Sequence, residues 1–137
     1  MNVEFDYKSY KDSVVSFMIS DNIRGRFARI DKSLNDILSQ HNYPEKVSGL
    51  IAETILLAVM IGQAVKLRWK LSLQIRGSGP IKLIAVDYFS PKEQNYSANI
   101  RAYAKFDHGI IESSSKDDFA FLGEGFFSVL IDQGVGT

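Results

Sequence analysis

The pattern of hydrophobic and polar residues predicts an antiparallel hairpin followed by two helices. Residues 14–19 form a β-branched and aromatic run that ends in a polar turn, and residues 23–30 alternate, which is typical of a partner strand. From Asp31 the apolar residues recur at intervals of three and four, which predicts a short helix that ends before His41. Pro44 favours the start of a second helix, since proline fits the first helical turn.

The second helix, about residues 44–66, is the most informative element. From Ile55 onward its apolar residues point in almost every direction around the helix axis. A helix that is apolar all round is covered on more than one side, so we expect a buried central helix with sheets packed on it. Its longest uncharged apolar stretch, residues 54–65, is well short of the roughly 20 residues that span a bilayer. We therefore expect no membrane segment.

The second half of the chain is predicted to be mostly β-structure. A turn at Gly77-Ser78-Gly79-Pro80, a loop over 107–116 and a short helix over about 115–122 separate its strands. The strands themselves are expected at residues 71–76, 81–89, 98–106 and 126–131. The expected fold class is α+β, a three-layer β/α/β arrangement around the buried helix of about residues 44–66, with mainly antiparallel strands.

Composition supports a single globular domain over residues 1–137 and narrows its chemistry. The chain is 45% hydrophobic and 23% charged, which is normal for a packed protein. It has no cysteine, so these residues carry no disulfide, thiolate metal site or cysteine nucleophile. Sixteen basic residues balance sixteen acidic ones, which argues against nucleic acid as a partner. No secretory signal is visible, and we expect a soluble, cytoplasmic protein.

The charge is unevenly distributed along the chain. Residues 47–105 carry eight basic groups against three acids, whereas residues 106–137 carry six acids against Lys116. One interpretation is that segments of opposite sign lie near each other in the fold or across a dimer. The other is a basic surface for an anionic ligand.

The residues that could carry chemistry are few and isolated. His41 and His108 lack the spacing of a metal site, and no nucleophile elbow accompanies them. Glu53, at the start of the most apolar part of the central helix, would suit a general acid or base. The alternative is an acid at the helix edge that is paired with an arginine or reaches water. The glycines of residues 77–80 lead into a strand, unlike a phosphate-binding loop. We expect no enzyme, and no catalytic, cofactor-binding or metal-binding residue.

Eight short motifs, in order, resemble the N-terminal domain of the heat-shock protein 33 family, the redox-regulated holdase chaperones also called 33 kDa chaperonins. They cover most of residues 14–134. The motifs are Arg24-Gly25-Arg26 with Arg29 and Ile30, Leu34-x-x-Ile37-Leu38-x-x-His41-x-Tyr43-Pro44, Leu50-x-x-Glu53, Leu71-x-Leu73-Gln74-x-x-Gly77-x-Gly79-Pro80, Val86-Asp87-Tyr88, Arg101-Ala102-Tyr103-Ala104, Leu122-Gly123-x-Gly125 and Ile131-Asp132-Gln133-Gly134.

The resemblance implies a stress-response chaperone that binds unfolded or misfolded client proteins without ATP and that tends to form a homodimer. In the family, a C-terminal module binds zinc through four cysteines, and their oxidation unmasks the binding surface. None of those cysteines is in this sequence, and the family chain is about twice as long. The resemblance therefore implies an N-terminal chaperone domain, or most of one, without its zinc-binding redox module.

An apolar sheet face is the expected surface for clients. If Leu71, Leu73 and Ile75 face the helix, the opposite face is predicted to include Ile84, Val86, Phe126 and Leu130. The alternative is that all four belong to the core. Two other classes of function stay open: a small-molecule binder or enzyme that uses Glu53 or Asp107-His108, and a structural module whose apolar face only forms a dimer.

Overall fold

The computed structural model describes residues 12–93, 96–113 and 117–135, with helices and strands close to those expected. The helical elements are α1 (Lys32–Ser39), α2 (Glu45–Ala64), α3 (His108–Ser113) and a short 3-10 helix, η1 (Asp118–Phe121). The strands are β1 (Ser13–Ser20), β2 (Ile23–Arg29), β3 (Lys70–Gly77), β4 (Ile81–Phe89), β5 (Asn99–Phe106) and β6 (Gly125–Asp132).

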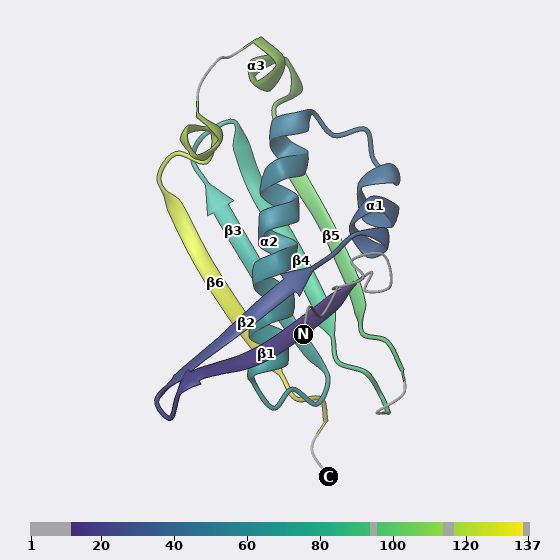
Figure 1. Cartoon of the computed structure of the whole chain (residues 1–137). Coiled ribbons are helices and arrows are strands. Elements are labelled where there is room, and N and C mark those ends of the chain that lie inside the picture. Colours follow the sequence, from purple (N-terminus) through teal and green to yellow (C-terminus); the bar gives the residue numbers. More distant parts are fainter. Residues whose placement is uncertain (1–11, 94–95, 114–116, 136–137) are drawn as a thin grey trace, which may run out of the picture.

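Helix α2 lies between two antiparallel sheets (Figure 1). Strands β3 to β6 form a four-stranded sheet in the order β5-β4-β3-β6, behind α2 in the view of Figure 1. The β1–β2 hairpin crosses the other side of the helix, and both of its strands contact α2. The α+β fold class and the layering expected from the sequence are therefore confirmed.

Helix α2 is buried along a stripe and is not covered all round its axis. The buried residues of α2 recur every three or four positions, as expected for one continuous stripe. They are Val47, Leu50, Ile51, Thr54, Ile55, Ala58, Val59 and Gly62. Leu57, in contrast, is 37% exposed. Contrary to the expectation from the sequence, length does not argue against a membrane segment, because the 20 residues of α2 are long and apolar enough to cross a bilayer. The core helix of a folded domain passes the same test.

Close packing between α2 and the sheet depends on Gly62. A β-carbon at Gly62 would lie 2.5 Å from the ring of Tyr88, a buried residue of β4. The Tyr88 hydroxyl accepts a hydrogen bond of 2.7 Å from the Gln63 side chain. Burial raises the pKa of Tyr88, and the hydrogen bond from Gln63 only partly offsets this effect. Gly62 thus allows α2 and β4 to approach closely.

The segment after β5 differs from expectation. Residues 107–116 were expected to form a loop, but α3 begins at His108. The amide of Ile111 donates to the carbonyl of Asp107, and the Ile111 side chain is buried in the core, so an apolar anchor stabilises this turn of helix. The start of the short helix expected over about 115–122 lies partly outside the described residues, because 114–116 are not among them. The short helix expected before Gly123 is present as η1.

The turn between β3 and β4 packs directly on the segment that leads into β6. The amides of Ser78 and Gly79 donate to the carbonyls of Glu124 and Leu122, at 2.8 and 3.0 Å. The amide of Glu124 donates in return to the Ser78 hydroxyl at 3.1 Å. Gly123, with φ of +65°, allows the chain to turn there. Residues 77–80 are thus a hairpin turn, as expected, that also fixes the entry of β6.

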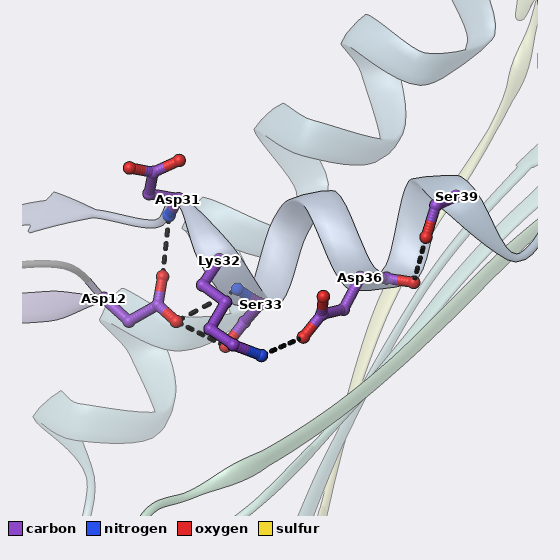
Figure 2. Close-up of polar contacts among 6 residues, drawn as sticks. All are labelled: Asp12, Asp31, Lys32, Ser33, Asp36 and Ser39. Carbon is purple, nitrogen blue, oxygen red and sulfur yellow. Dashed lines mark hydrogen bonds and ion pairs between the residues drawn. The ribbon is translucent and has the colours of Figure 1, made fainter.

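Asp12 caps helix α1 from a distant point in the sequence (Figure 2). The residue before the helix, Asp31, makes no side-chain capping bond. Instead the Asp12 carboxylate accepts hydrogen bonds from the Asp31 amide at 2.6 Å, the Ser33 amide at 3.0 Å and the Ser33 hydroxyl at 2.6 Å. Burial raises the pKa of Asp12, but these hydrogen bonds outweigh it, so the net pKa is lowered. The cap ties β1 to α1.

Replacing Asp12 by Ala is expected to lower the free energy of unfolding by about 1–2 kcal/mol, because the cap is lost. Asn at this position keeps an acceptor oxygen and is the matched control. The pKa of Asp12 is lower in the folded state than in the unfolded state, so the charged carboxylate stabilises the fold at pH values above the unfolded-state pKa. This stabilisation is lost as the pH falls through the folded-state pKa. Urea unfolding across the acid range checks this, and an Ala variant as stable as the parent would contradict it.

Candidate functional site

Strand β6 is an apolar strand at the edge of the four-stranded sheet. It pairs with β3 on one side, and no described strand pairs with its other side. Its large apolar side chains are exposed on both faces: Phe126, Phe127, Val129, Leu130 and Ile131. Edge strands are ordinarily protected by lysine, proline or a bulge, and β6 contains neither lysine nor proline. We call these five residues the β6 surface.

The register divides the β6 surface between the two faces of the sheet. In an antiparallel pair, directly opposed side chains lie on the same face. Val129 and Ile131 are opposed to the buried Leu73 and Leu71, so they lie on the face that α2 covers, near its margin. Phe126 is opposed to Arg76 on the outer face and Leu130 to Ser72. Their exposed fractions, 79% and 63%, are the largest of the β6 surface.

Two of the four residues predicted for the outer face lie in the core instead. Ile84 and Val86 are opposed to Ile75 and Leu73 on β3, and their side chains are 0% and 1% exposed. Their placement on the outer face was therefore wrong. The pairing of β3 with β4 joins odd-numbered to even-numbered residues, whereas the pairing of β3 with β6 joins odd to odd. Even-numbered residues thus face the helix on β4 and face away from it on β6.

The hairpin carries a second exposed apolar surface that was not expected from the sequence. Val15 and Phe27 are opposed to each other and are 52% and 64% exposed. Phe17 lies across Gly25, where a β-carbon would meet its ring. Val14, on the other face of β1, packs against the core. Residues 15, 17 and 19 are apolar at alternate positions, which indicates that they share one face of β1. The pattern alone does not indicate whether this face or the opposite one packs against the core.

The residues considered for catalysis are not brought together. His41 packs on the ring of Tyr43 and His108 on the ring of Phe106, with centroids 5.1 and 4.3 Å apart. Glu53 is exposed on α2, as expected for an acid at a helix edge. Among the described residues no group of three or more His, Asp or Glu side chains could hold a metal ion. With no cysteine in the chain either, these residues do not fit the zinc site of the resembled family.

Comparison with known proteins agrees with the motifs. The family described as Hsp33 protein matches residues 12–137. The 33 kDa chaperonin of Caulobacter vibrioides is 32% identical over 133 residues, which cover 90% of this chain and 41% of that protein. The 33 kDa chaperonin of Haemophilus influenzae is 27% identical over 132 residues, which cover 96% of this chain and 42% of that protein. The chain thus spans about two-fifths of the length of these curated relatives. It belongs to the Hsp33 protein family.

Proposed function

We propose that this chain is a chaperone domain that holds unfolding proteins in the cytoplasm without ATP. Membership of a chaperone family supports a role in binding client proteins. The observation that carries the proposal is the β6 surface, a large apolar strand exposed on both faces. Exposed apolar patches of this kind are typical of interaction sites in folded proteins.

The mechanism follows from the chemistry of the surface. An unfolding client exposes apolar side chains, and contact with Phe126 and Leu130 removes both sets of side chains from water. The open side of β6 also presents backbone donors and acceptors that suit an extended client segment. Burial of one Phe or Leu side chain is worth about 1.5–3 kcal/mol. No covalent step or nucleotide hydrolysis is needed for binding of this type.

We propose redox regulation only for the longer family protein. In that proposal, zinc bound by C-terminal cysteines controls access to the client surface, and the present residues supply the surface without the switch.

Homodimer formation is part of the same proposal. The open side of β6 favours it, because two such strands can pair with each other.

Light scattering from a thermally unfolding client tests the holdase proposal. Equimolar protein is expected to suppress the scattering in the absence of ATP, and to do so equally in reducing and oxidising buffer because the chain has no cysteine. Absence of suppression would show that these residues alone are not a holdase. Size measurement with and without client then separates client binding from a module that only forms dimers.

A further inference from the structure

A pocket of about 690 Å³ lies where the end of β4 and the start of β5 meet the residues just before β3. Its lining includes Trp69, Phe89, Tyr96 and three cations, Arg68, Lys92 and Arg101. A volume of this size is typical of small-molecule sites. None of these residues belongs to the β6 surface, so the pocket is a separate feature of the fold.

The cations of the pocket outnumber its acids. Glu93 is the single acidic residue of the lining among the described residues. Arg101 donates to Asp87 at 3.0 Å through one guanidinium nitrogen, which leaves further N–H donors of that group for another partner. The side chains of Arg68 and Lys92 are exposed. The pocket thus presents positive charge to an anion. This agrees with the interpretation that the basic residues of 47–105 form a surface for an anionic ligand.

Aromatic rings accompany these cations. Trp69 is 45% exposed and Tyr96 is 64% exposed, although both are residues that ordinarily gain from burial. Phe89 lies on the outer sheet face with the guanidinium carbon of Arg101 5.1 Å from its ring centroid. Exposed rings beside cations are the combination that binds a planar base together with its phosphate.

We propose that this pocket binds a nucleotide, with the base on the aromatic side chains and the phosphate on Arg68, Lys92 and Arg101. The ligand chemistry, a planar base joined to a phosphate, is shared by free nucleotides and by short single strands. The proposal concerns binding only and involves no hydrolysis. It is independent of the holdase proposal, because client binding is assigned to the β6 surface.

The sole tryptophan of the chain lies in this pocket, so its fluorescence reports on the site directly. Titration with AMP is expected to quench Trp69 saturably, and adenosine and inorganic phosphate are each expected to bind at least about tenfold more weakly, since each lacks one of the two contacts. A short adenylate oligonucleotide identifies the source: tighter binding than AMP assigns the site to a single strand, and equal or weaker binding assigns it to a free nucleotide. No saturable change with AMP, or equal quenching by adenosine, would overturn the proposal.

Removal of the charges provides the second test. The variant Arg68→Gln with Lys92→Gln is expected to weaken AMP binding about tenfold or more, since charged contacts to the phosphate are lost. The matched control, Arg24→Gln with Lys82→Gln, removes two exposed charges outside the pocket and is expected to leave AMP affinity unchanged. Equal weakening in both variants would overturn the site. Both variants are expected to suppress client scattering like the parent, which separates the two proposals.

Discussion

A variant with Phe126→Ser and Leu130→Ser is expected to lose most of its ability to suppress client aggregation. The two side chains are 79% and 63% exposed on the same outer face, four residues apart along β6. If each buries its apolar surface against a client, each contributes about 1.5–3 kcal/mol, so the double change should weaken client binding by about a hundredfold or more. Light scattering at a range of chaperone concentrations measures how much more of the variant is needed for the same suppression.

The fold of this variant is expected to remain intact, because the two side chains contribute little to the core. Thermal unfolding followed by circular dichroism should show a transition close to that of the parent. Val86→Ser, a change on the helix-facing side of β4, is expected to lower the midpoint temperature of unfolding strongly. It shows how large a shift a change in the core produces. Val15→Ser with Phe27→Ser removes a comparable surface from the hairpin. A larger loss of suppression in that variant would place the client site on the hairpin instead of β6.

Replacing Gly77 by Ala is expected to destabilise the chain by about 1–3 kcal/mol. A β-carbon at this position would collide with the carbonyl oxygen of Leu122 and lie 2.7 Å from that of Ile81. Both neighbours are backbone atoms, so neither can rotate away as a side chain would. The hydrogen bonds between Ser78 and Glu124 would have to lengthen, and the pairing of Gly77 with Gly125 at the start of β6 would be disturbed.

Gly49→Ala is the matched control for this prediction. Gly49 lies in α2, and a β-carbon there would meet no neighbouring heavy atom within 4 Å, so a methyl group has room. Alanine in a helix is favoured over glycine by about 0.5–1 kcal/mol, and a small stabilisation is expected. Urea unfolding of both variants provides the comparison. Equal stability of the Gly77 variant and the parent would show that the turn does not depend on close backbone approach.

Local patterns in the sequence were sufficient to predict most helices and strands. The all-apolar stretch of α2 indicated a helix between layers, and the turn at Gly77 to Pro80 separated two strands at the correct place. These features depend on neighbouring residues alone. The helix α3 was missed because its six residues contain no extended apolar period, and Ile111 becomes an anchor only when the core is assembled.

The candidate surface could be predicted only in part. The sequence of β6 showed apolar residues on both faces, and the exposure of Phe126 and Leu130 agrees with their predicted placement. The misplacement of Ile84 and Val86 arose from register, which determines whether odd or even residues of one strand share a face with those of the next. That relation is set by pairing across the sheet, and β3 pairs with β6 far along the chain.

The pairing of β6 with β3 also bears on the order in which the sheet forms. Strands β3, β4 and β5 are neighbours both in sequence and in the sheet, so short loops suffice to join them. Strand β6 must return past β4 and β5 to reach β3, which requires closure of a much longer loop and favours late docking. Until β6 docks, β3 has an open edge and the apolar run of β6 is unpaired. During that interval the chain itself displays the kind of segment that its folded form is proposed to hold.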